Sequence, residues 1–264
     1  MARRRSTLPP LLWVPAGVAL ALLLLPLVAL VVRAPWASLP ALLAEPTVVQ
    51  ALGLSLGTAS AATAACLVLG IPLALVLSRS ARWPAVPRRL LRALVTVPLV
   101  LPPVVGGVAL LLLLGRRGLI GQWLPFTIPF TPAAVVIAQI FVSMPFLVIA
   151  VEGALSSSDR RFEAAASTLG ASRLTVFRRI TLPLIAPGVA SGALLCFTRS
   201  LGEFGATITF AGSFPGTTQT LPISTYLLLQ TDPNAAIALS LVLMVVSVAV
   251  LVSLRDRWVP GALA

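Results

Sequence analysis

Two charged residues lie four positions apart inside an otherwise apolar stretch of this 264-residue chain. Arg199 and Glu203 belong to the segment FTRSLGEFGATITFAG, residues 197–212, and their spacing places both side chains on one face of a helix. An arginine at bilayer depth costs about 2.5–3.5 kcal/mol on insertion scales, and a nearby carboxylate lowers that cost. Two interpretations stay open. The pair is a structural lock between helices, or it lies beside a translocation path lined by Arg199, Glu203 and Thr207, where the arginine attracts an anion.

A second polar stretch, DRRFEAAASTLGASRLTVFRRITLP at residues 159–183, contains five arginines, an aspartate and a glutamate. We call residues 159–181 the basic loop. Ser158 or Asp159 can cap a first short helix, and Glu163 in its first turn suits the positive end of the helix dipole. Gly170 permits a sharp bend, and a second short helix is expected at about 172–179.

The first of these short helices is expected to have one apolar face, formed by Phe162, Ala166 and Leu169. Ala164 and Ala165 have almost no side chain, so another backbone can approach them closely. Two interpretations of the basic loop are therefore open. It is an amphipathic element on anionic lipid headgroups, or it is a contact surface for another protein.

The composition indicates an integral membrane protein, and it excludes most catalytic chemistry. The chain is 58% hydrophobic, only 10% charged, and has a mean hydropathy of +1.04. It has no lysine for a phosphate-binding loop and no histidine for a zinc motif or a serine triad. Cys66 and Cys196 lie in apolar segments, as small hydrophobic residues rather than a disulfide or metal pair. We expect no catalytic residue, no cofactor and no metal, so the energy source is a partner or an ion gradient.

Six apolar segments are long enough to cross a bilayer as helices, which requires about 20 residues each. The predicted fold is therefore an all-α integral membrane protein with about six transmembrane helices. A short amphipathic piece is also expected around residues 223–229, and Asp232 followed by Pro233 is a good start for the last helix. The six predicted spans are 10–32, 50–78, 91–114, 132–153, 182–208 and 234–254.

The distribution of arginines predicts the orientation of these spans. With the N-terminus in the cytoplasm, fifteen arginines lie in cytoplasmic segments and three (Arg33, Arg116 and Arg117) lie outside. Such a bias follows the positive-inside rule, and it places both termini and the basic loop in the cytoplasm. Because the arginines follow the loops between spans, the formal charge of +12 indicates topology, and no nucleic-acid partner is expected.

The remaining loops and glycines carry weaker signals. Trp123, Phe126 and Phe130 in the outer loop at residues 115–131 suit either an interfacial aromatic belt or a docking surface. Glycines at 188 and 192, and at 202 and 205, predict close helix packing.

The basic loop resembles the EAA loop of permease subunits of type I importers driven by an ATP-binding cassette (ABC). That motif is Glu-Ala-Ala, three residues, Gly, nine residues, Ile, one residue and Leu-Pro. This chain matches it without departure. The matching residues are Glu163, Ala164, Ala165, Gly170, Ile180, Leu182 and Pro183.

The resemblance implies a coupling helix that rests on a separate cytoplasmic ABC ATPase subunit, with an external oxyanion-binding protein on the other side. It also implies a permease homodimer in a bacterial inner membrane, and a subunit that is not itself an enzyme. The implied division is an N-terminal tail, first helix and outer loop at 1–47, a permease domain at 48–254, and a cytoplasmic tail at 255–264.

The stretch RSLGEFGATITFAG, followed by TQTLPISTY, resembles the molybdate branch of these permeases. Molybdate import, with tungstate as a possible second substrate, is the expected function. Sulfate-type permeases share Leu-Gly-Glu-Phe-Gly, so import of sulfate or thiosulfate is an alternative. A gradient-driven secondary transporter is a more distant one, because such proteins commonly have paired internal repeats, and none is found here.

Overall fold

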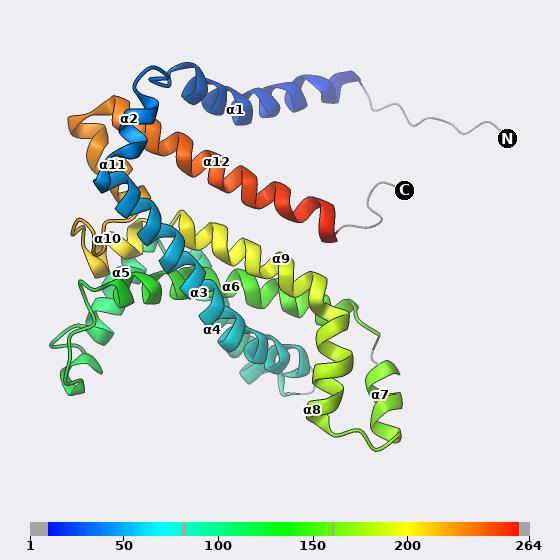
Figure 1. Ribbon diagram of the computed structural model, residues 1–264. Helices are drawn as coiled ribbons and strands as arrows, with labels where there is room; N and C mark the ends of the chain where they lie inside the picture. The colour runs from blue at the N-terminus through cyan, green and yellow to red at the C-terminus, as the bar shows by residue number, and fades with distance from the viewer. Residues whose placement is uncertain (1–9, 81–82, 160, 259–264) are drawn as a thin grey trace.

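The structure is a computed structural model that describes residues 10–80, 83–159 and 161–258. These residues form helices and connecting loops, without a strand (Figure 1). Residues 1–9 and 259–264, which belong to the two predicted tails, lie outside the described ranges. The α-helices are α1 (Trp13–Val32), α2 (Leu39–Ala44), α3 (Pro46–Arg79), α4 (Ala85–Val100), α5 (Pro103–Leu114), α6 (Pro132–Ser157), α7 (Arg161–Thr168), α8 (Arg173–Val176), α9 (Leu182–Leu201), α10 (Gly205–Ala211), α11 (Leu221–Thr231) and α12 (Pro233–Trp258).

Within the described residues, five helical segments are long and apolar enough to cross a membrane, and a bent pair of helices forms the sixth candidate. The predictions for the first, second, fourth and sixth spans agree with α1, α3, α6 and α12. The predicted and observed helices differ mainly in the residues at which they begin and end. Helix α12 continues to Trp258 and so includes residues 255–258 of the predicted C-terminal tail. Asp232 caps it as predicted, because Oδ1 accepts hydrogen bonds from Asn234 N and Ala235 N, both at 3.1 Å.

The prediction of one continuous span at 91–114 is wrong. Two helices, α4 and α5, replace it, and they meet at a bend of 115°. Pro102 and Pro103 cause the break, because neither has a backbone N–H and each forces the preceding residue out of the helical region. Leu101 is accordingly extended, with φ −66° and ψ 134°. Hydropathy could not show this bend because the residues around it are apolar.

The fifth span also differs from its prediction at both ends. It begins inside the basic loop, because the second short helix continues through a π-helical turn, Phe177–Thr181, into α9. Pro183 does not interrupt this helix, since it stands in the first turn of α9. At the other end, α9 stops at Leu201, and α10 begins only at Gly205. The predicted helix at 182–208 is therefore two helices with an interruption at residues 202–204.

Helices α3, α6 and α9 pack side by side and form the centre of the molecule (Figure 1). Gly188 and Gly192 lie where α9 crosses α6, and a Cβ at Gly192 would be 3.0 Å from the Cβ of Ala150. A Cβ at Gly205 would be 2.8 Å from the Cβ of Pro103 in α5. The close packing predicted for these three glycines is confirmed. It is not found at Gly202, whose nearest neighbour would be the Thr198 carbonyl at 3.6 Å.

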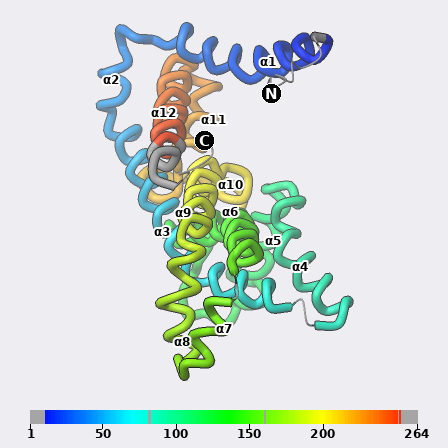
Figure 2. Tube along the Cα trace, turned by 90° about the vertical axis from the view of Figure 1, so that its right-hand side faces the viewer, coloured from blue at the N-terminus to red at the C-terminus, as the bar shows by residue number. Residues whose placement is uncertain are grey.

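The two ends of this central bundle have different structures. Helices α7 and α8 lie at one end, and α2, α10 and α11 lie at the other (Figure 1). Helix α1 has no buried residue and lies apart from the bundle, next to α12 (Figure 2). The bundle therefore holds the basic loop at one end and the interruption between α9 and α10 toward the other.

Candidate functional site

The basic loop is a helical hairpin whose ends are capped by its own side chains. Asp159 Oδ1 accepts a 2.9 Å hydrogen bond from Arg161 N at the start of α7, and Ser172 Oγ accepts a 3.2 Å bond from Thr175 N in α8. Gly170 joins the two helices with φ +84°, a conformation that costs a residue with a side chain roughly 1–2 kcal/mol. The predicted bend at Gly170 and the cap at Asp159 are both confirmed.

The two ends of the EAA-like motif meet in the folded loop. Thr181 Oγ1 donates a 2.6 Å hydrogen bond to Glu163 Oε1, and Thr181 is only 2% exposed. Thr181 is the unspecified residue of the motif, between Ile180 and Leu182, so the motif gave no reason to select it. The bond ties helix α7 to the base of the span that contains α9.

The remaining residues of the motif take three different positions. Ala164 lines a cavity between the loop and the ends of α3 and α6, together with Glu163. Ala165 is exposed. Ile180 and Leu182 are half-buried along the helix that leads into the bundle, and Pro183 is exposed. The loop therefore brings Glu163 close to the 180–182 turn, whereas Gly170 lies at its tip.

The apolar face predicted for α7 is exposed to a large extent. Phe162 is 57% exposed and Leu169 is 88% exposed, whereas Ala166 is half-buried. Large apolar side chains exposed on a polar hairpin are available for contact with a partner or with lipid.

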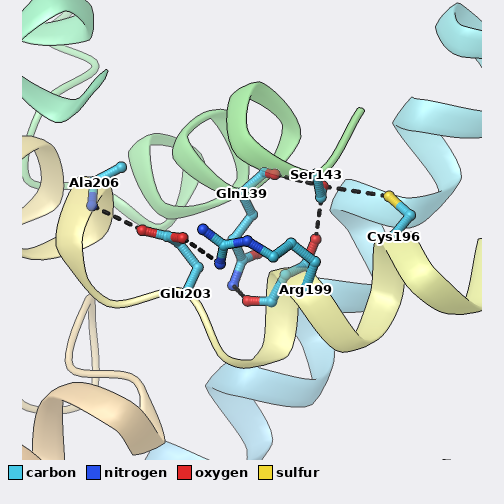
Figure 3. A network of polar contacts seen from close by, with 7 residues as sticks. Gln139, Ser143, Cys196, Arg199, Glu203 and Ala206 are labelled. Atoms are coloured by element: carbon cyan, nitrogen blue, oxygen red, sulfur yellow. Dashed lines mark hydrogen bonds and ion pairs between the residues drawn. The ribbon is translucent and has the colours of Figure 1, made fainter. Parts of the chain in front are cut away.

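The second candidate site lies at the interruption between α9 and α10. Arg199 Nη1 is 2.6 Å from Glu203 Oε2, and Glu203 Oε1 accepts a 2.8 Å hydrogen bond from Ala206 N in the first turn of α10 (Figure 3). The predicted ion pair is present, but its two residues do not share one helix face, because Glu203 follows the end of α9. The carboxylate joins the end of one helix to the start of the next.

Burial of the pair is unequal. The side chain of Glu203 is 1% exposed and that of Arg199 is 28% exposed. A buried carboxylate is tolerated only when it is paired and hydrogen-bonded, and both conditions hold here. Arginine has five N–H donors, so the partly exposed guanidinium can contact Glu203 and a further acceptor at the same time.

A layer of buried polar groups from three helices adjoins this pair. Gln139 of α6 is 1% exposed, and its Nε2 donates to Thr58 Oγ1 in α3 at 3.2 Å and to the Ser200 carbonyl in α9 at 3.1 Å. Ser200 Oγ donates a 2.9 Å bond to Ser143 Oγ, which also contacts Cys196 Sγ at 3.3 Å (Figure 3). Both cysteines are buried and free, as predicted.

Thr207, the third residue of the predicted path, lies in the first turn of α10 and is 0% exposed. Its Oγ1 and the Oε1 of Gln139 have no hydrogen-bond partner among the described residues. Sequence reasoning missed Gln139, although an amide within an apolar span is a signal in itself, because polar groups at bilayer depth are costly. Thr58, Ser143 and Ser200 gave no comparable signal.

An all-helical bundle with five or six candidate membrane spans among its described residues defines a polytopic membrane protein. A solved structure with the same architecture is a bacterial ABC transporter involved in the import of the acidic polysaccharide alginate. The TM-score is 0.69 with 17% identity, and the alignment covers 92% of each chain. At that identity the likeness concerns the fold.

Residues 67–260 match the family described as binding-protein-dependent transport system inner membrane component, and the chain belongs to that family. It is 51% identical over 255 residues to the molybdenum transport system permease protein ModB of Mycobacterium tuberculosis, covering 96% of each chain. It is 37% identical over 241 residues to the sulfate transport system permease protein CysT of Salmonella typhimurium, covering 89% of this chain and 86% of the relative.

Proposed function

We propose that this chain is the permease subunit of an ABC importer for molybdate. The observation that supports this most directly is the 51% identity to a molybdenum permease over 96% of both chains. The sulfate permease is more distant, at 37% identity, so the sulfate alternative is not favoured. The chain is a transporter subunit and not an enzyme, and ATP is hydrolysed by a separate subunit.

The basic loop is the part of the permease that contacts the ATPase. Its exposed side chains Phe162 and Leu169 pack against the ATPase. The Glu163–Thr181 hydrogen bond then transmits movement of α7 to α9. A rigid two-helix element joined to a span suits such a transfer. This arrangement requires the loop and both termini to lie in the cytoplasm of a bacterial cell.

Two copies of the chain form the transporter, with the path along their two-fold axis. ATP binding draws the two basic loops together, and the spans open toward an external oxyanion-binding protein. After hydrolysis the spans return and release the anion inward. The binding protein supplies most of the selectivity, because a tight site within the permease would trap the ion.

Arg199 contributes positive potential to the path. Glu203 neutralises much of its charge and fixes the guanidinium from one side, and the partly exposed arginine can still meet a dianion through its other N–H groups. Thr207, whose hydroxyl has no hydrogen-bond partner among the described residues, lies four residues after Glu203 in the first turn of α10. A weakly positive path of this kind passes an anion without retaining it.

Reconstitution tests the proposal. The permease, its ATPase and the binding protein in proteoliposomes should take up labelled molybdate only with ATP. Excess tungstate should compete, and excess sulfate should compete weakly. Uptake that continues without the ATPase, or that sulfate inhibits as strongly as unlabelled molybdate, contradicts the proposal.

A further inference from the structure

A cavity of about 480 Å³ lies behind the basic loop, and neither the translocation path nor the exposed apolar face of α7 uses it. Its wall combines residues of the loop with residues of the bundle. Arg79 and Ser78 come from the end of α3, Leu155 comes from α6, and Arg173 comes from α8. Any occupant would therefore contact both the loop and the spans.

The charged groups of this wall favour an anion. Among the described residues, no carboxylate lies within ion-pair distance of Arg79 or Arg173. The one carboxylate in the wall belongs to Glu163, and its Oε1 already accepts the hydrogen bond from Thr181. The wall therefore contains two arginines, both exposed, and one carboxylate that is already engaged. The Ser78 hydroxyl, which makes no hydrogen bond to another described residue, adds a neutral donor.

We propose that this cavity binds a tetrahedral oxyanion of the phosphate class between Arg79 and Arg173. Guanidinium groups present paired N–H donors that match phosphate oxygens, and charge-assisted bonds of this kind are the stronger ones. The cavity is large enough for such a group, whose volume is comparable with that of a few water molecules of about 30 Å³ each. The bound anion links α3 to α8 and stabilises the basic loop against the bundle.

Two sources can supply this group. One is the headgroup of an anionic phospholipid, since the cavity lies where two spans end and Leu155 and Phe177 add apolar wall. The other is a free oxyanion from the cytoplasm. The same arginine contacts would recognise a lipid headgroup and a free oxyanion, so the experiment must distinguish these two sources.

The test uses the full-length permease alone in nanodiscs, so its outcome does not depend on the proposed function. One set contains phosphatidylcholine only and is titrated with inorganic phosphate, molybdate or chloride at constant ionic strength. A second set contains increasing phosphatidylglycerol without added oxyanion. The thermal unfolding midpoint is followed by tryptophan fluorescence, and native mass spectrometry counts retained phosphatidylglycerol.

The variants separate this site from general charge. We expect R79Q/R173Q to weaken saturable binding by at least about tenfold, because it removes both charged donors of the proposed site. R178Q/R179Q is the matched control, since it removes the same charge from exposed residues of the same loop outside the cavity, and its binding should change less than the tenfold expected for R79Q/R173Q. Ala164→Met, which fills the cavity and keeps both arginines, should weaken binding even if the double variant folds poorly.

A saturable response to phosphate or molybdate identifies a free anion, and a response to phosphatidylglycerol alone identifies a lipid headgroup. Either result supports the site when R79Q/R173Q weakens the response by the expected factor or Ala164→Met weakens it. No response above chloride and phosphatidylcholine overturns the proposal. Equal responses in wild type, R79Q/R173Q and Ala164→Met overturn it as well.

Discussion

The hydroxyl of Thr181 donates a 2.6 Å hydrogen bond to the carboxylate of Glu163, eighteen residues away in sequence. One partner lies in the first turn of α7 and the other lies just before α9. This side-chain bond connects the hairpin to the span, and substitution of either residue tests it directly. Through this bond, Glu163 positions helix α7 in addition to carrying a surface charge.

Thr181→Val removes the donor and keeps the shape of the side chain. We expect a loss of about 1 kcal/mol in the stability of the loop and a several-fold fall in transport per ATP hydrolysed. Thr181→Ser should restore the wild-type ratio. Thr168→Val is the control, because the Thr168 hydroxyl bonds only within the loop, to the Ala165 carbonyl. A wild-type ratio in Thr181→Val argues against a role for this bond in coupling.

Glu163→Lys replaces the acceptor with a cation. The variant should insert in the membrane normally, yet lose the ATPase or its substrate-stimulated turnover, because the loop can no longer be fixed to α9. Copurification of the ATPase and the stimulated rate measure these effects. Arg178→Gln, a flanking exposed change, should keep both. Normal stimulated turnover in Glu163→Lys contradicts the assignment of the loop.

Gly170→Ala places a Cβ on a residue with φ +84°. The expected cost is roughly 1–2 kcal/mol, observed as faster proteolysis of the loop and weaker binding of the ATPase. Gly153→Ala in α6 is the matched control, since a Cβ there meets no atom within 4 Å and needs no positive φ. Equal proteolysis of the two variants would show that the bend tolerates a side chain.

Neutralising the Arg199–Glu203 pair distinguishes a structural lock from a path residue. Arg199→Gln alone leaves a carboxylate that is 1% exposed without its cation, at a cost of about 3–5 kcal/mol. R199Q/E203Q removes both charges and should fold better than Arg199→Gln.

We expect R199Q/E203Q to transport molybdate at least about tenfold more slowly than wild type, equivalent to about 1.4 kcal/mol, because the positive potential is lost. R92Q/E152Q is the control pair. It neutralises a contact whose side chains are 60% and 18% exposed, worth less than about 1 kcal/mol. Wild-type uptake by a folded R199Q/E203Q would assign the pair to structure only.

The predicted orientation can be tested with single cysteines in a background of Cys66→Ala and Cys196→Ala. Leu169→Cys lies at the exposed tip of the basic loop, and Thr217→Cys lies in the exposed segment before α11. In intact cells, a membrane-impermeant maleimide should label Thr217→Cys alone. Labelling of Leu169→Cys before the membrane is opened would reverse the proposed topology.

Local properties of the chain determined the membrane class, the positions of most spans, the hairpin and the identity of its bend and cap. Hydropathy is a property of about twenty consecutive residues, and loop charge and helix capping depend on even shorter segments. Each of these signals can therefore be identified in the sequence directly. The ion pair was predictable for the same reason, because Arg199 and Glu203 are only four positions apart.

Only the tertiary structure decided which side chains from distant parts of the sequence contact one another. Pro102 and Pro103 break the helix locally, but the size of the 115° angle between α4 and α5 depends on their packing against α6 and α10. The bond of Thr181 to Glu163 and the contacts of Gln139 with α3 and α9 join residues far apart in sequence. Such partners are set by how the helices cross, and no local pattern of residues encodes that geometry.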